Sequence, residues 1–159
     1  MIGSNTFFFS DIVRYSQIVQ KNEQLAITLL EEHNNILIKS IGLYKGQVVK
    51  FIGDSIFAQF QSADDACLAA LQIQNNLINR NKLCRFDEKI NIRIGIHSGT
   101  AIKTKDDFLG NDINIASRIE GVCQSNSIFI SSLAFKNLKN PKTFHYRKIK
   151  HIKLKNISN

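Results

Sequence analysis

Two aspartates stand where carboxylates can do chemistry. Asp11 follows the apolar run Thr6-Phe7-Phe8-Phe9, which predicts a buried strand that ends in a carboxylate. Asp54 follows Gly53 in a tight turn between two further predicted strands. Carboxylates on adjacent strand ends repel each other, and a divalent cation such as Mg²⁺, which takes oxygen ligands, resolves that conflict. Two such ions can hold the attacking and leaving oxygens of an in-line phosphoryl displacement.

Each aspartate also has a structural interpretation. Asp11 can cap the N-terminus of a helix, and Asp54 can be an ordinary turn residue, because aspartate is common at both kinds of position. The spacing of the two residues leaves both interpretations open.

The periodicity of apolar residues predicts the elements that would position these side chains. Strand patterns occupy 6–9, 47–52, 55–60, 89–97, 100–102 and 127–130, with turns at 53–54 and 98–99. Helical patterns occupy 23–41, which ends at Gly42, and 63–77, 113–123 and 132–138. A polar stretch covers 103–107, and a basic stretch with alternating character covers 143–154. This mixture predicts an α/β or α+β domain with one mainly antiparallel sheet flanked by helices.

Composition narrows the class of protein. A chain of 159 residues, 43% hydrophobic and 21% charged, is typical of one globular domain and excludes a disordered tail or a disulfide-rich mini-protein. The formal net charge of +8 lies wholly in residues 121–159, which contain no carboxylate, and this points to an anionic partner. The three cysteines have no paired spacing, and neither a signal peptide nor a long apolar run is visible. We therefore expect a cytoplasmic domain with no membrane contact from this segment.

Four motifs, in chain order, resemble those of class III nucleotide cyclases. Residues 9–16 (FSDIVRYS) resemble the family's F-x-D-I-x-G-[FY]-[ST], and residues 50–60 (KFIGDSIFAQF) resemble K-x-x-G-D-x-x-x-A-x-F. Residues 93–99 (RIGIHSG) resemble R-x-G-[IV]-[HN]-x-G, and residues 110–120 (GNDINIASRIE) resemble G-[DN]-x-V-N-x-A-[AS]-R-[LIM]-E. A later match, Leu154-Lys155-Asn156, is similar to the family's L-K-[GN]. The resemblance implies the ferredoxin-like, palm-type fold of this family in its bacterial form.

The resemblance assigns metal chemistry to the first two motifs. Asp11 and Asp54 match the aspartates that hold two Mg²⁺ or Mn²⁺ ions, and the backbone carbonyl of Ile12 matches a further ligand. The backbone segment that would hold the substrate phosphates comprises Ile12, Val13, Arg14, Tyr15 and Ser16. Arg14 stands where glycine is usual, so its side chain could either clash with the phosphates or add a positive contact.

The other motifs imply residues that read the base and stabilise the transition state. Lys50 matches the lysine, and Asp107 the second position, that read adenine in the family. A lysine and a carboxylate suit adenine because its N1 is an acceptor and its 6-amino group a donor, so this pair implies ATP. Asn114 would orient the ribose, and Arg118, four residues later on one predicted helix face, would stabilise charge on the phosphoryl oxygens. Lys155 matches a lysine that contacts the substrate phosphates.

The resemblance also implies a homodimer. Each site of the family lies across a dimer interface, where one subunit supplies the metal aspartates and the other supplies the remaining residues. This chain carries both sets, which implies two equivalent sites. The connection from Gly99 to Gly110 is short, as in a bacterial subgroup, and the family's last apolar strand is missing after the L-K-N motif. We therefore expect residues 1–159 to be one catalytic domain of a longer protein that has regulatory domains elsewhere.

The predicted function is an adenylate cyclase catalytic domain that converts ATP to 3′,5′-cyclic AMP and pyrophosphate through attack of the ribose 3′-hydroxyl on the α-phosphate. The alternative is a catalytically weak or inactive cyclase-like domain that binds nucleotide or a partner for regulation. Nucleic acid is not an expected partner, because Phe7, Phe8 and Phe9 form an unbroken apolar run typical of a core strand. His97 ends an alternating strand at a position that the family does not use for chemistry, so we expect it to be structural.

Overall fold

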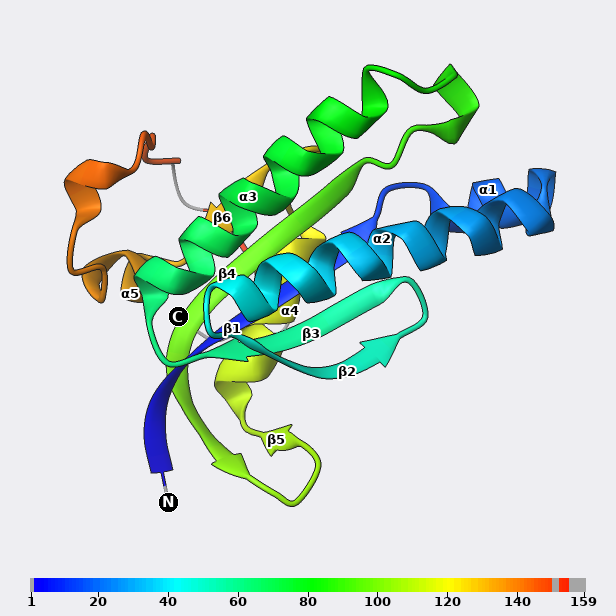
Figure 1. Ribbon diagram of the computed structural model, residues 1–159. Helices are drawn as coiled ribbons and strands as arrows, with labels where there is room; N and C mark the ends of the chain where they lie inside the picture. The colour runs from blue at the N-terminus through cyan, green and yellow to red at the C-terminus, as the bar shows by residue number, and fades with distance from the viewer. Residues whose placement is uncertain (1, 150–151, 155–159) are drawn as a thin grey trace.

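A computed structural model describes residues 2–149 and 152–154, without the side chains of residues 2–4. One sheet with the strand order β2-β3-β1-β4-β5 forms its centre, and β6 pairs with β4 (Figure 1). The strands are β1 (Ile2–Ile12), β2 (Gln47–Ile52), β3 (Ser55–Phe60), β4 (Ile92–Lys103), β5 (Phe108–Leu109) and β6 (Ile128–Ile130). Every strand pair is antiparallel except β4 with β6. The predicted mainly antiparallel sheet is confirmed.

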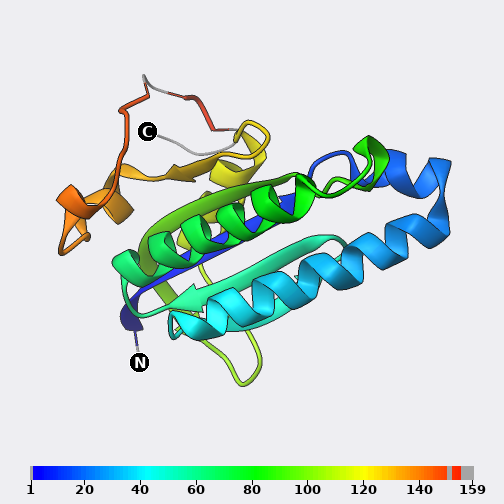
Figure 2. The same cartoon turned by 45° about the horizontal axis from the view of Figure 1, so that its top comes forward.

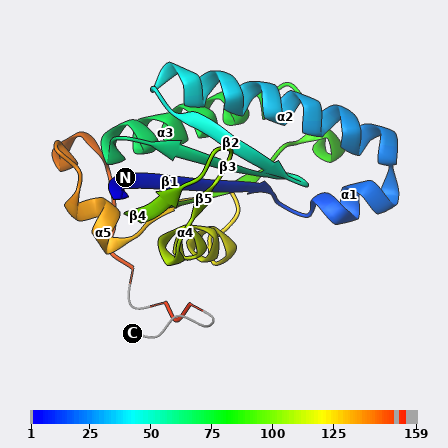
Figure 3. The same cartoon turned by 90° about the horizontal axis from the view of Figure 1, so that it is seen from below.

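Helices cover both faces of this sheet. The helix pair α2 (Glu23–Leu43) and α3 (Ala63–Asn81) lies side by side on one face (Figure 2). On the opposite face lies α4 (Asn111–Gly121), so the domain has three layers (Figure 3). The shorter elements are α1 (Tyr15–Lys21), η1 (Phe86–Glu88), α5 (Ser132–Lys136) and η2 (Pro141–Thr143). None of the helices in the described part of the chain is both long enough and apolar enough to cross a bilayer.

The alternating side chains of β1 divide the core in two. Phe8 and Ile12 belong to the larger cluster, which lies under α2 and α3, whereas Phe7 and Phe9 belong to a smaller cluster under α4. The Phe9 ring stacks on Phe57 with ring centroids 4.6 Å apart. The three consecutive phenylalanines are buried, the most exposed at 7%. They are therefore core residues, as the sequence predicts, and are not available to stack on nucleic acid bases.

The course of β4 corrects the predicted turn at Ser98 and Gly99. The strand runs unbroken through both residues and pairs with β1 over residues 92–102. Glycine is needed at position 99 for a different reason, because a Cβ there would collide with the side chain of Asp112 at the start of α4. The strands predicted at 89–97 and 100–102 are therefore one strand.

Smaller differences concern the ends of helices. Gly42 does not end α2, which continues through it to Leu43, and the left-handed residue beyond the helix is Lys45, with φ at 60°. The helix α4 spans 111–121 rather than 113–123, and α5 ends at Lys136 rather than at 138. Neither α1 nor β5 was predicted, and each is short. The basic stretch forms no strand in residues 144–149 and 152–154.

Candidate active site

The structure brings Asp11 and Asp54 to one end of the sheet. Asp11 lies near the end of β1, and Asp54 lies in the turn between β2 and β3, where Gly53 has a φ of 60°. The backbone amide of Ile12 donates a hydrogen bond of 3.0 Å to Oδ2 of Asp54. Burial raises the pKa of Asp54 above its ordinary value, and the charge of Asp11 acts in the same direction, although the Ile12 hydrogen bond opposes both. The predicted neighbourhood of the two carboxylates is confirmed.

Arg93 is the direct cross-strand partner of Asp11 in the β1–β4 ladder. Its Nε donates to Oδ1 of Asp11 at 2.9 Å, and its Nη2 donates to Oδ2 at 2.5 Å. Both carboxylate oxygens therefore receive one guanidinium, the bidentate arrangement that arginine forms most strongly. The Asp11 side chain is 16% exposed, so this ion pair is largely shielded from water.

Glu120, at the end of α4, is a third carboxylate in the same place. Its Oε1 lies 3.3 Å from Nε of Arg93, and its side chain is only 10% exposed. Burial and the neighbouring Asp11 carboxylate raise the pKa of Glu120 to about 8, although Arg93 opposes the shift. Glu120 reaches Arg93 because α4 packs closely on β4. Gly95 permits this close packing, since a Cβ at that position would collide with the backbone nitrogen of Glu120.

These carboxylates fit divalent cations. Asp11, Asp54 and Glu120 face a single guanidinium, and burial, with a smaller contribution from the neighbouring carboxylates, raises the pKa of Asp54 and of Glu120. Carboxylate oxygen is the hard ligand that Mg²⁺ and Mn²⁺ prefer. Within the described residues no three His, Cys, Asp or Glu side chains form a complete metal cluster. A pair of aspartates that depends on substrate phosphates for the remaining ligands agrees with this finding.

The segment after Asp11 leads into α1 through a left-handed residue. Arg14 has φ at 62° and ψ at 27°, and its carbonyl accepts from the amides of Gln17 and Ile18. The left-handed conformation at position 14 explains why the family motif usually has glycine there, because glycine adopts it without steric cost. The amides of Ile12 and Val13 already donate to Asp54 and to Asn91, so the amides left for phosphates are those of residues 14–16. The Tyr15 hydroxyl donates to Ala26, which fixes α1 on α2.

Lys50 and Asp107 form an ion pair although 57 residues separate them in the sequence. The Lys50 Nζ on β2 lies 2.5 Å from Oδ2 of Asp107, which belongs to the turn between β4 and β5. That turn is closed by reciprocal hydrogen bonds between Thr104 and Asp107. The Lys50 ammonium, and to a lesser extent the Phe108 amide, lowers the pKa of Asp107. The structure therefore brings the two predicted base-reading residues together.

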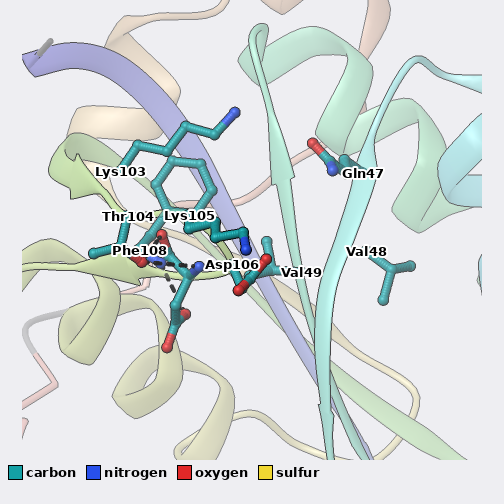
Figure 4. A pocket seen from close by; sticks show the side chains of 9 residues that line it. Gln47, Val48, Val49, Lys103, Thr104, Lys105, Asp106 and Phe108 are labelled. Carbon is teal, nitrogen blue, oxygen red and sulfur yellow. Dashed lines mark hydrogen bonds between the residues drawn. The ribbon is translucent and has the colours of Figure 1, made fainter.

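A cavity of about 230 Å³ opens beside this ion pair, between β2 and the β4–β5 turn (Figure 4). Its lining consists of Gln47, Val48 and Val49 on one side and residues 103–108 on the other. Pockets that hold whole drug-sized ligands are roughly 300–1,000 Å³ in volume. This cavity can therefore hold only part of a nucleoside triphosphate.

Asn114 and Arg118 lie on α4 but face away from the carboxylates. Because α-helical residues advance by roughly 100°, Arg118 is turned by roughly 200° from Glu120, and Asn114 by roughly 240°. Glu120 points at Arg93, so the predicted transition-state pair points elsewhere. The structure thus unites Asp11 with Asp54, and Lys50 with Asp107, whereas it does not bring Asn114 and Arg118 to the aspartates. Lys155 lies outside the described residues.

Sequence reasoning missed Arg93 and Glu120. Both stand at fixed positions of the quoted motifs, Arg93 at the first position of one and Glu120 at the last position of another. That signal was available, but only the sheet register and the packing of α4 show that both meet Asp11.

His97 has a structural environment. It is 5% exposed, its Nδ1 lies 2.7 Å from Oγ of Ser131, and its Nε2 lies 3.3 Å from Oδ1 of Asp112. The Ser131 hydroxyl caps α5 by accepting from the amide of Ala134. Burial lowers the pKa of His97. These contacts tie α4 and α5 to β4, in agreement with the expected structural role.

The mainly antiparallel sheet with helices on both faces agrees with the palm-type fold that the motifs imply. The chain belongs to the family described as adenylate and guanylate cyclase catalytic domain, which it matches over residues 2–158. Members of this family generally use divalent metal ions, bind nucleotide substrates and commonly dimerise.

Individual relatives agree with this assignment. The chain is 29% identical over 123 residues to a putative adenylate cyclase 3 of Rhizobium meliloti (strain 1021), a match that covers 77% of this chain and 21% of the relative. It is 30% identical over 170 residues to an adenylate cyclase of Anabaena cylindrica, covering 94% of this chain and 34% of the relative. The chain therefore spans about a third or less of these relatives. The crystal structure of an adenylate/guanylate cyclase/hydrolase from Silicibacter pomeroyi superposes with a TM-score of 0.89 at 25% identity, covering 99% of this chain and 92% of the other.

Proposed function

We propose that this domain is an adenylate cyclase that converts ATP to 3′,5′-cyclic AMP and pyrophosphate. The observation that carries the choice of ATP is the ion pair between Lys50 and Asp107, with 2.5 Å between Nζ and Oδ2. A lysine donor and a carboxylate acceptor match adenine N1 and its 6-amino group, whereas guanine presents the reverse pattern at O6 and N1–H. A base of the wrong pattern leaves polar groups unpaired, which makes discrimination of this kind strong.

Asp11 and Asp54 would hold two Mg²⁺ or Mn²⁺ ions, together with the backbone carbonyl of Ile12. Such ions lower the pKa of the ribose 3′-hydroxyl and neutralise charge on the phosphates. The support from this chain is that its carboxylates outnumber the guanidinium that faces them. The amides of residues 14–16 would bind phosphate oxygens.

The remaining contributions come from residues on α4 and in the C-terminal segment. Asn114 would orient the ribose so that the 3′-hydroxyl lies in line with the α-phosphate. The Arg118 guanidinium would stabilise the charge that develops on the phosphoryl oxygens. Lys155 would contact the phosphates from the basic C-terminal segment, which explains one of the eight positive charges beyond residue 120.

The active form would be a homodimer with two equivalent sites. Asn114 and Arg118 face away from the aspartates of their own chain, and the cavity beside Lys50 and Asp107 holds only part of a nucleotide. A second copy supplies the complementary half of each site in such a dimer, and a symmetric pair forms both sites at once. The parts of the nucleotide that one chain cannot hold are then held by its partner.

The relatives extend well beyond the matched region, and we propose the same context here. Residues 1–159 would be a single catalytic domain under the control of regulatory segments in the full-length protein, with its site in the cytoplasm, where ATP is available.

A cyclase assay tests the proposed function. Purified protein is given ATP or GTP with Mn²⁺ or Mg²⁺ over a range of protein concentrations, and cyclic nucleotide is measured. We expect cyclic AMP, with a specific activity that rises with protein concentration because the dimer forms. If no product appears at high concentration, and Asp11→Ala behaves as the wild type does, the proposed activity is wrong.

A further inference from the structure

Arg93 lies between the carboxylates of Asp11 and Glu120 and contacts the two in different ways. Its Nε donates to Oδ1 of Asp11 at 2.9 Å and its Nη2 donates to Oδ2 at 2.5 Å, so the two hydrogen bonds are parallel. Its Nε also lies 3.3 Å from Oε1 of Glu120, without the alignment of a hydrogen bond. Its Nη1 donates to the carbonyl of Gly121 at 3.4 Å. The guanidinium therefore already rests against the C-terminal end of α4, where the helix dipole favours a cation.

Glu120 has an unsatisfied oxygen next to this guanidinium. Oε1 is buried and has no hydrogen-bond partner among the described residues. Buried carboxylate oxygens normally have one, and an exception calls for an explanation. A small turn of the Arg93 fork away from Asp11 would satisfy it.

The proposed function creates the need for such a turn. A carboxylate that receives two parallel hydrogen bonds from arginine has one lone pair of each oxygen occupied, and the guanidinium charge beside it repels a metal ion. Arg93 and a metal ion therefore compete for Asp11. A displaced guanidinium only 29% exposed would be left without a counterion, which is costly when a charge is shielded from water.

We propose that Glu120 is the alternative acceptor for Arg93, so that a metal ion and Arg93 exchange places on Asp11. In the metal-free protein Arg93 orients and neutralises Asp11. In the metal-bound protein the guanidinium pairs with Glu120 and Gly121, and Asp11 becomes a ligand. Arg93 and Glu120 are positioning residues in this scheme, which rests on the proposed metal-binding role of Asp11.

Binding of Mn²⁺ alone, measured by electron paramagnetic resonance of the free ion, tests the exchange. The full chain is titrated without nucleotide, and all variants are compared with the wild type at one fixed pH. We expect Glu120→Gln to bind Mn²⁺ at least about tenfold more weakly, the loss typical when a partner of a metal ligand is removed. The matched control Glu31→Gln, on an exposed position of α2, should bind as the wild type does.

Variants of Arg93 separate the exchange from a structural effect. Arg93→Lys keeps the charge but cannot make two parallel hydrogen bonds, so it should bind Mn²⁺ more tightly than the wild type. The double variant Arg93→Gln with Glu120→Gln should recover most of the affinity that Glu120→Gln loses, because no displaced guanidinium remains to be paired. If the double variant is as weak as Glu120→Gln, or if Arg93→Lys binds more weakly than the wild type, the exchange is wrong.

Asp11→Asn distinguishes failure of the exchange from failure of the proposed function. If Asp11→Asn loses Mn²⁺ binding while Glu120→Gln keeps wild-type affinity, the metal site stands and the exchange is refuted. If Asp11→Asn itself binds Mn²⁺ normally, the metal site is wrong. Should Glu120→Gln fail to fold in thermal melts, the comparison of Arg93→Lys with the wild type decides alone.

Discussion

Base selectivity offers a sharp test of the Lys50–Asp107 pair. The paired change Lys50→Glu with Asp107→Cys replaces a donor and an acceptor that suit adenine by an acceptor and a small residue that suit guanine. The side chains are 43% and 31% exposed, and an ion pair of that exposure contributes only about 1 kcal/mol or less to stability. The variant should therefore fold.

The expected magnitude follows from two hydrogen bonds to charged side chains. Each is worth about 1.5–3 kcal/mol once the base excludes water. Partial exposure places the sum near the lower end, at about 3 kcal/mol, or about a 100-fold shift in the ratio of kcat/KM for ATP to that for GTP.

The assay measures cyclic AMP and cyclic GMP formation at low substrate concentration with Mn²⁺. The matched control is Arg85→Glu with Asp87→Cys, which makes the same change in charge at an exposed ion pair that does not line the cavity. The control should leave the ATP to GTP ratio within about threefold of the wild type. The reasoning is refuted if the Lys50 and Asp107 variant keeps both its activity and the wild-type ratio.

Three further predictions concern stability. Gly95→Ala should destabilise the domain by about 1–3 kcal/mol, because the new Cβ collides with the backbone of Glu120. Gly42→Ala is the control and should be neutral or stabilising, because there is open space around that position. Thermal melts compare the two variants, and equal changes in melting temperature would contradict the packing argument. Arg14→Gly should raise the melting temperature by about 1–4 °C, since glycine adopts a φ of 62° without strain, and a lower melting temperature would refute this account. The raised Glu120 pKa means that the folded protein holds this proton more tightly than the unfolded chain, so its contribution to stability is complete below pH 4.5 and is lost as pH rises to about 8. In metal-free denaturant titrations Glu120→Gln should therefore gain stability relative to the wild type between those pH values, and parallel pH profiles would contradict the assignment.

Local patterns predicted the hairpin well. The strands Gln47–Ile52 and Ser55–Phe60 have the expected bounds, because alternation and a Gly-Asp turn are signals contained within one short segment. The same local logic failed at Gly99. The residues around Gly99 resemble a turn. Glycine is needed there because α4, which begins 12 residues later in the chain, places the Asp112 side chain against it.

The site divides in the same way. The proximity of Asp11 to Asp54 was expected from their places at strand ends and that of Lys50 to Asp107 from the family resemblance, and the structure shows both pairs together. Arg93 looks locally like one more residue of an alternating strand, and Glu120 like the end of an amphipathic helix. Their meeting depends on strand register and on the contact at Gly95, neither of which has a local signature.

The orientation of α4 has a genetic consequence. Glu120 faces the carboxylates of its own chain while Arg118 lies on another side of α4, so in the proposed homodimer each complete site would draw on two polypeptides. A chain with Asp11→Ala and a chain with Arg118→Ala would each be silent alone. Co-expressed in equal amounts they would complement each other, since half of the dimers would be mixed and each mixed dimer would contain one intact site. About a quarter of wild-type activity would return without any intact gene in the cell.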